Sequence, residues 1–185
     1  MNTPNFVSIY KNVISPKGDR YNNSNEDGIV LNSVINETDF KFTNRLGIVK
    51  TPAKTENILK EDDEVIVHHN VFRRFFDVYG KLKDGGSYIR DNVYACHSDQ
   101  IFAYRRNGEW KSYGDFCFIK PIKSEEFEEY EDCVGTVFIN HPSLEVYGIK
   151  EGDKVYYIKG GEYKFDIEGE IYYRMLSRNV KCLAN

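Results

Sequence analysis

Lys60-Glu61-Asp62-Asp63-Glu64-Val65, a charged turn that leads into the aliphatic run Val65-Ile66-Val67, has a second copy in altered form, Lys150-Glu151-Gly152-Asp153-Lys154-Val155. Such an uninterrupted aliphatic run is typical of a buried β-strand. Three further segments recur in the same order: the opening segment Phe6–Ile14 as Phe116–Ile122, Leu46–Val49 as Val134–Val137, and Val93–Ile101 as Tyr172–Val180. Four matches in one order indicate a tandem duplication. We therefore expect two domains, residues 1–110 and 111–185.

The composition favours an all-β fold and argues against two classes of partner. Aromatic residues make up 15% of the chain of 185 residues, and no segment shows the sustained 3.6-residue periodicity of a long amphipathic helix. The formal net charge is -4. This charge gives no electrostatic footprint for nucleic acid or for an anionic membrane surface.

The cysteines and the N-terminal residues indicate a cytoplasmic protein. Cys96, Cys117, Cys133 and Cys182 are scattered without a C-x-x-C pair, so we expect reduced, half-buried thiols and neither a zinc knuckle nor a redox motif. The first residues lack the basic and apolar regions of a signal peptide. No apolar run approaches the ~20 residues that span a bilayer.

A long polar loop is predicted in the first domain, at about residues 15–43. The loop is rich in Asn, Ser, Asp and Gly and contains the apolar segment Gly28-Ile29-Val30-Leu31. This segment is either the start of an ordinary core strand or an apolar hook on a flexible tether that binds a groove on another protein. In the corresponding place the second domain has only the acidic stretch Lys123–Asp132, a solvated connector or a contact site carried by Phe127 and Tyr130. Because the second copy keeps the strand pattern without the apolar segment, the hook is favoured.

Aromatic and basic residues are mixed in Val71–Tyr79. Such a mixture is able to form a stacking platform for single-stranded nucleic acid, but the negative net charge opposes this function, and aromatic strands more often fill a barrel. Lys83-Asp84-Gly85-Gly86 is predicted to be the turn of a hairpin, with Tyr88–Arg90 as its returning strand.

Neither a catalytic site nor a metal or cofactor site is predicted. The histidines His68, His69, His97 and His141 have no spacing to carboxylates or cysteines that suggests a metal or a nucleophile. The serines lack a G-x-S-x-G setting, and neither a P-loop nor a Rossmann fingerprint occurs. We expect a protein that is not an enzyme.

Several segments together resemble the GroES-type co-chaperonins. Gly28-Ile29-Val30-Leu31 is similar to the mobile-loop motif of that family, and Asn44–Val49 resembles the strand that follows the loop. Lys60–Val67 resembles the acidic turn and its strand, and Ser98–Tyr104 the closing strand. The resemblance implies two tandem, partly open β-barrels, of which only the first carries a mobile loop. It also implies that Gly28, Ile29, Val30 and Leu31 bind a GroEL-type chaperonin, that ATP is bound by this partner, and that the chains form a homo-oligomeric ring.

The departures from the family pattern suggest a divergent, bacteriophage-encoded member. The segment Val71–Arg90 is enlarged, and the chain carries one loop instead of one in each half. One loop per chain implies a ring of about seven chains, matching a sevenfold chaperonin. The expected location is then the host cytoplasm, and a phage capsid protein is a candidate folding substrate. The alternatives are a non-enzymatic β-barrel that serves as a structural or assembly adaptor of a phage and, further off, a barrel that binds single-stranded nucleic acid.

Overall fold

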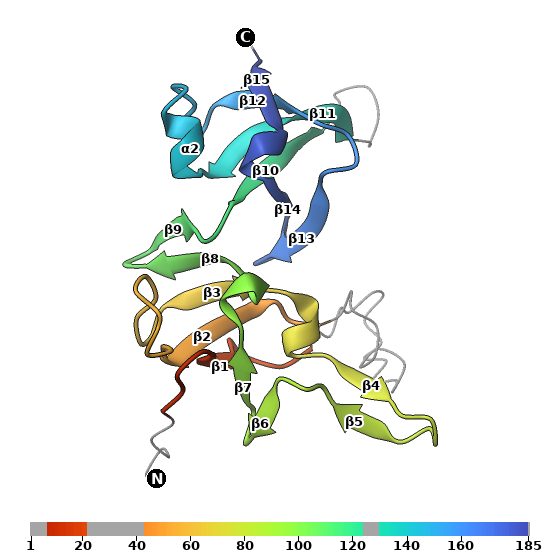
Figure 1. The fold of residues 1–185 in the computed structure, drawn as a ribbon. Helices are drawn as coiled ribbons and strands as arrows, with labels where there is room; N and C mark the ends of the chain where they lie inside the picture. The colour runs from red at the N-terminus through yellow and green to blue at the C-terminus, as the bar shows by residue number, and fades with distance from the viewer. Residues whose placement is uncertain (1–6, 22–42, 124–129, 185) are drawn as a thin grey trace. The chain divides into compact units, whose positions relative to one another are not determined.

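The computed structural model describes residues 7–21, 43–123 and 130–184, and the fold is all-β. It divides into unit 1, Met1–Tyr104, and unit 2, Arg105–Asn185 (Figure 1). The division falls within β8, whereas the boundary predicted at residues 110 and 111 lies within β9. Among the described residues, α2 (Pro142–Glu145) is the only α-helix.

The strands of unit 1 form a sheet with the order β6-β7-β1-β2-β3-β8-β9, whose last strand, β9, follows the division between the units. Its strands are β1 (Asn12–Pro16), β2 (Leu46–Thr51), β3 (Glu64–Val67), β6 (Tyr88–Arg90), β7 (Val93–Cys96) and β8 (Ile101–Arg106), and the order ends with β9 (Glu109–Ser112). A separate two-stranded hairpin contains β4 (Arg74–Phe76) and β5 (Leu82–Asp84), and two short 3₁₀ turns are η1 (His69–Val71) and η2 (Ser98–Gln100). Fully buried Ile14, Val49, Val65, Phe72 and Tyr94 are at the centre of the core.

Unit 2 has a sheet with the order β13-β14-β10-β11-β12-β15. Its elements are β10 (Phe116–Lys123), β11 (Tyr130–Ile139), β12 (Lys154–Tyr157), β13 (Tyr163–Ile167), β14 (Glu170–Leu176), η3 (Ser177–Asn179) and β15 (Val180–Leu183). Its core includes Ile119, Val137, Val155 and Met175. Within the described residues, neither large sheet pairs its first strand with its last, so neither is a closed barrel.

The two sheets repeat one strand register. In unit 1, Pro16 of β1 is opposite Gly47 of β2, and a β-bulge follows Val13. In unit 2, Pro121 of β10 is opposite Gly135 of β11, and a bulge follows Phe118. The next pairs agree as well: Gly47 is opposite Val65, as Gly135 is opposite Val155.

The charged turns quoted at the start are also equivalent atom by atom. The Lys60 amide donates to Oδ2 of Asp63 over 2.7 Å, and the Lys150 amide donates to Oδ2 of Asp153 over the same distance. Both turns place a residue in the left-handed region between these partners, Asp62 with φ 65° in one and Gly152 with φ 88° in the other. Glycine adopts this conformation at little cost, whereas Asp62 does so with some strain.

Two predicted strand positions were wrong. The first strand begins at Asn12, not at Phe6, and it includes Ser15 and Pro16. The residues before it are β-prone, but Val7, Ile9 and Tyr10 are exposed and have no sheet face to pack on.

The hairpin turn predicted at Lys83–Gly86 was also misplaced. The turn of the β4–β5 hairpin lies at residues 77–81. Tyr88–Arg90 forms β6, which pairs with β7. The turn between these two strands consists of Asp91 and Asn92, both at positive φ. Two successive residues at positive φ make the tight turn that suits the twist of a hairpin. The hairpin that contains Tyr88–Arg90 therefore turns at Asp91-Asn92 and not at Gly85-Gly86.

Candidate functional site: the stem of the long loop

The predicted binding residues Gly28, Ile29, Val30 and Leu31 lie outside the described residues, within 22–42. The structure does describe the two chain segments from which residues 22–42 depart, and we call these segments, 17–21 and 43–45, the loop stem. Ser15 and Pro16 belong to β1, and β2 begins at Leu46, so the connection between the strands is 17–45, shifted by two residues from the predicted 15–43.

Backbone and amide hydrogen bonds hold the two arms of the stem together. Tyr21 and Thr43 form an isolated antiparallel bridge. The buried Asn44 side chain donates from Nδ2 to the carbonyls of Lys17 and Asp19, each over 2.8 Å, and its Oδ1 accepts from the Leu46 amide. Because the Asn44 side chain bonds to two backbone carbonyls of the opposite arm and to one backbone amide of β2, the two arms are held together at their base.

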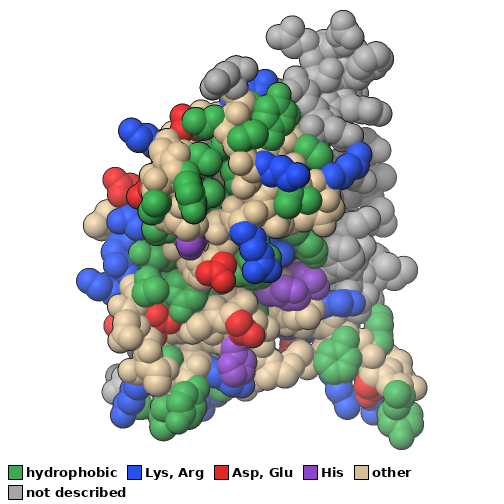
Figure 2. Space-filling model, turned by 45° about the horizontal axis from the view of Figure 1, so that its top comes forward, with side chains coloured by type: hydrophobic (Ala, Val, Ile, Leu, Met, Phe, Trp, Pro, Cys, Tyr) green, Lys and Arg blue, Asp and Glu red, His purple; other side chains and the backbone are tan. Residues whose placement is uncertain are grey.

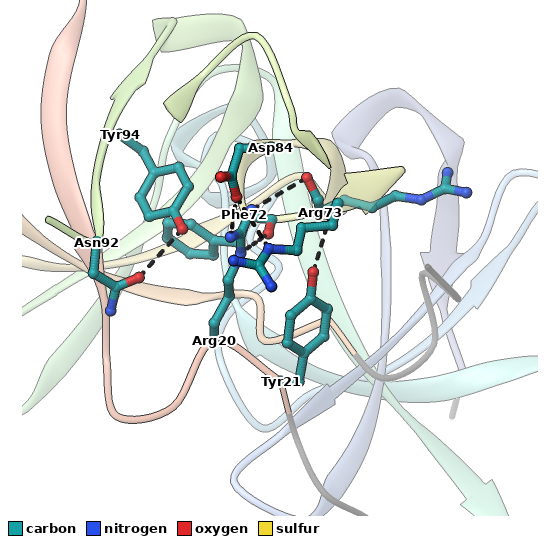
Figure 3. A network of polar contacts seen from close by, with 8 residues as sticks. Arg20, Tyr21, Phe72, Arg73, Asp84, Asn92 and Tyr94 are labelled. Carbon is teal, nitrogen blue, oxygen red and sulfur yellow. Dashed lines mark hydrogen bonds and ion pairs between the residues drawn. The ribbon is translucent and has the colours of Figure 1, made fainter. Parts of the chain in front are cut away.

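Arg20 connects the stem to another part of unit 1 (Figure 3). Its guanidinium donates from Nε to the Phe72 carbonyl, from Nη1 to Oδ1 of Asp84 in β5, and from Nη2 to the Arg73 carbonyl over 3.4 Å. The same group lies 5.2 Å from the ring centroid of Tyr94. The Arg20 side chain is only 11% exposed. A planar fork of donors suits this combination of carboxylate, carbonyls and aromatic face, which a lysine cannot reproduce.

Tyr21 and Arg74 make a second connection beside the first. The Arg74 amide donates to the Tyr21 hydroxyl over 3.0 Å, and Arg74 Nε donates to Oδ1 of Asp84 over 3.1 Å. Asp84 therefore accepts from one arginine of the stem and from one of β4. The stem and the β4–β5 hairpin are one connected piece of structure.

Electrostatics agree with this geometry. Partial burial acts to raise the pKa of Asp84, but the hydrogen bonds from Arg20 and Arg74 outweigh it, and the pKa lies below the usual value for aspartate. Burial raises the pKa of Tyr94 to about 12, although Arg20 opposes the shift. Asp84 is therefore ionised and Tyr94 neutral at neutral pH, which is the state that the contacts of Arg20 require.

The contacts of the stem are structural, since its Lys17 pairs with Glu64 of β3 and its Arg20 pairs with Asp84 of β5. Among the described residues, no cluster of three or more His, Cys, Asp or Glu side chains is arranged to hold a metal ion.

His69 has its pKa lowered to about 4, mainly by burial and then by the neighbouring His68, Arg45 and Arg73. The four cysteines are free; Cys96 and Cys117 are fully buried rather than half-buried as expected, and burial raises both thiol pKa values.

Exposed apolar side chains on the β4–β5 hairpin were not anticipated. The sequence suggested that these aromatics fill a barrel, yet Phe75 and Phe76 are each 45% exposed, Val78 is 93% exposed and Tyr79 is 84% exposed. The hairpin extends away from the main sheet of unit 1 (Figure 1), and hydrophobic side chains gather on it at the lower right of Figure 2. The pair Arg73-Arg74 followed by Phe75-Phe76 was the available signal, because it places one basic residue on each face of a short strand and leaves both faces partly polar.

Among the described helices, none has the length and apolar character needed to cross a membrane. In comparisons with models of protein families and with curated proteins, neither a family nor a curated relative matched the chain.

Proposed function

We propose that this protein is a co-chaperonin of the GroES type that caps an ATP-dependent, GroEL-type chaperonin ring through Gly28, Ile29, Val30 and Leu31. The observation that supports this most is the placement of the long connection. Residues 17–45 join β1 to β2 at the point where the equivalent strands of unit 2, β10 and β11, are joined by the much shorter 124–129. A sheet that forms without the extra residues does not need them for its core.

The energetics favour several weak contacts over one strong contact. Fully burying Ile29, Val30 and Leu31 contributes roughly 1.5–3 kcal/mol each. Ordering the polar tether that the sequence predicts costs roughly 1–2 kcal/mol per residue. One loop therefore binds weakly, whereas several loops on one ring bind firmly because each engagement after the first is intramolecular. The ring is released when the nucleotide state of the chaperonin changes the groove.

The rest of the proposal follows from the family resemblance. The protein is a divergent, bacteriophage-encoded member that acts in the host cytoplasm, forms a ring of about seven chains and assists folding of proteins such as a phage capsid protein. ATP is bound and hydrolysed by the chaperonin, and the co-chaperonin itself is neither an enzyme nor a nucleic-acid-binding protein.

A pull-down with a bacterial chaperonin in the presence of nucleotide tests the proposal. Val30→Asp places a charge in the apolar motif and should abolish co-purification with the chaperonin. Val34→Asp is a matched control, since it makes the same change four residues later, outside the motif, and should retain binding.

Retention of Val30→Asp at the level of the unmodified protein would exclude the motif as the contact. Failure of the unmodified protein to bind any chaperonin would exclude the function and favour the phage assembly adaptor.

A further inference from the structure

Unit 1 contains two segments that have no equivalent of similar size in unit 2. One is the connection 17–45, which contains the loop stem. The other is the β4–β5 hairpin, since the corresponding residues 158–162 lead directly from β12 to β13 without forming strands. The equivalence is anchored by η2 and η3, because the His68 amide donates to the Gln100 carbonyl just as the Ile158 amide donates to the Asn179 carbonyl.

These two segments contact each other. Arg20 and Tyr21 of the stem are bound to Asp84 and Arg74 of the hairpin by the contacts described above. The sheet does not require these two segments to contact each other, because unit 2 forms a sheet of the same strand order with a short connection in place of each. Their contact indicates that they serve one purpose.

The hairpin is also held in shape before any partner arrives. Asp77 accepts from the amides of Tyr79 and Lys81 through Oδ1, each over 2.9 Å, and its Oδ2 pairs with Lys83 over 2.9 Å. The backbone adds a bond from the Gly80 amide to the Asp77 carbonyl. A turn fixed in this way presents Val78 and Tyr79 to solvent with little ordering left to perform on binding.

We propose that the β4–β5 hairpin is a second docking element for the chaperonin that the loop binds, with Val78 and Tyr79 as its contacts and Arg20 as the residue that positions it. This inference rests on the proposed function. The occupant is an apolar surface of the chaperonin, because the hairpin is continuous with the stem from which the binding motif departs. A partner that holds the loop is therefore brought beside the hairpin, where a second contact gains from effective concentration.

The experiment measures the affinity of the full-length protein for immobilised bacterial chaperonin with nucleotide present. The variant Val78→Ser, Tyr79→Ser should weaken binding by about tenfold or more, as expected for loss of apolar anchors. The chain offers a matched control, Val146→Ser, Tyr147→Ser. This pair is 82% and 79% exposed and also precedes a glycine at positive φ, Gly148 in place of Gly80, and its variant should bind like the unmodified protein.

A second variant tests the positioning role. Arg20→Lys keeps the charge but loses the fork of contacts, so we expect an intermediate loss of affinity. In a double-mutant cycle this loss should be much smaller when Val78 and Tyr79 are already replaced, because both changes remove one contact. If the affinity losses of Arg20→Lys and of the hairpin variant are instead additive, Arg20 has a structural role only and does not position the hairpin for binding.

The outcomes separate this inference from the proposed function. If Val30→Asp abolishes binding while Val78→Ser, Tyr79→Ser binds normally, the loop contact stands and the hairpin contact is wrong. If the hairpin variant instead lowers the mass of the assembly in sedimentation, the hairpin contacts a second copy of this chain and the inference is wrong. If the unmodified protein binds no chaperonin, both proposals fall together.

Discussion

Gly47 in β2 and Gly135 in β11 occupy equivalent positions, yet the space around them differs. A Cβ at Gly135 would overlap Cγ2 of Ile119 and approach the Lys120 carbonyl oxygen to 2.7 Å, and the carbonyl belongs to a paired strand that cannot easily move. A Cβ at Gly47 would meet its nearest atoms, in Phe72 and Ser15, at 3.2 Å. The close approach of backbones is therefore tighter in unit 2.

Gly135→Ala should destabilise the protein by about 1–3 kcal/mol, the usual cost of overpacking. Gly47→Ala is the matched control and should be nearly neutral, since a small shift relieves its contacts and the reduced freedom of the unfolded chain contributes about 0.4–1 kcal/mol in favour. Urea titration followed by far-UV circular dichroism measures the difference. Equal effects of the two substitutions on the free energy of unfolding would contradict the tighter backbone approach at Gly135.

Asp84 provides a pH-dependent test of the connection between the stem and the hairpin. Its pKa is lowered in the folded protein, so its contribution to stability is complete above the usual aspartate pKa and is lost as the pH falls through the folded-state value. At pH 7, Asp84→Asn should cost about 1–3 kcal/mol, because Arg20 loses a charged acceptor. The difference from the unmodified protein should shrink below pH 4 or so, as Asp84 itself becomes protonated.

A matched control for this variant is Asp91→Asn, which changes an exposed aspartate at positive φ to a residue that tolerates the same conformation. Urea titrations at several pH values compare the two. A stability difference for Asp84→Asn that stays constant down to pH 2 would show that the carboxylate is not the group that matters.

At the residue scale, the sequence predicted local features and missed distant ones. The turns at Asp63 and Asp153 were predicted from the charged segment Lys60–Val65 and its second copy Lys150–Val155, and each contains the same amide–carboxylate hydrogen bond. Arg20 was missed because its partners, Phe72 and Asp84, are far away in the sequence and nothing local distinguishes it from another loop arginine. Its role depends on tertiary contacts that only the fold brings together.

At the scale of elements, it was easier to predict that a strand exists than to predict the residues at which it begins and ends. The all-β fold and the repeated strands followed from aliphatic runs and turn residues, whereas β1 was placed too early and the turn of the β4–β5 hairpin too late. Strand limits depend on which residues find a partner, and propensity does not record this. Pro16 has no amide hydrogen to donate to a neighbouring strand, but it is still paired with Gly47 in β2.

The two interpretations of the long connection differ in a prediction at this scale. Replacing residues 22–42 with Ser124-Glu125-Glu126-Phe127-Glu128-Glu129, the equivalent part of unit 2, keeps both arms of the stem. If the removed residues are a binding loop, thermodynamic stability should change by less than about 1 kcal/mol, the loop-closure difference, and chaperonin binding should be lost. Thermal unfolding and the pull-down measure these together. A strongly destabilised protein would instead show that Ile29, Val30 and Leu31 belong to the core.

For the whole molecule, duplication explains how the chain has two sheets of matching register but one long connection. Unit 2 has the same strand order with a much shorter connection, so under the proposed function each chain offers the chaperonin a single apolar motif. Binding by single motifs is weak, so the function requires several chains that act together. The number of chains is then set by the partner, since matched symmetry allows every loop to engage at once.

We therefore predict a ring of about seven chains of 21.6 kDa each, or about 150 kDa, in analytical ultracentrifugation or mass photometry. Val30→Asp and the shortened loop should leave this mass unchanged, because the motif is proposed to contact the chaperonin and not the neighbouring chain. An assembly of four chains would fit a protein with a loop in each half, which the short connection 124–129 between β10 and β11 argues against. A monomer at micromolar concentration would remove the multivalency on which binding depends, and with it the physical basis for a cap held by weak loops.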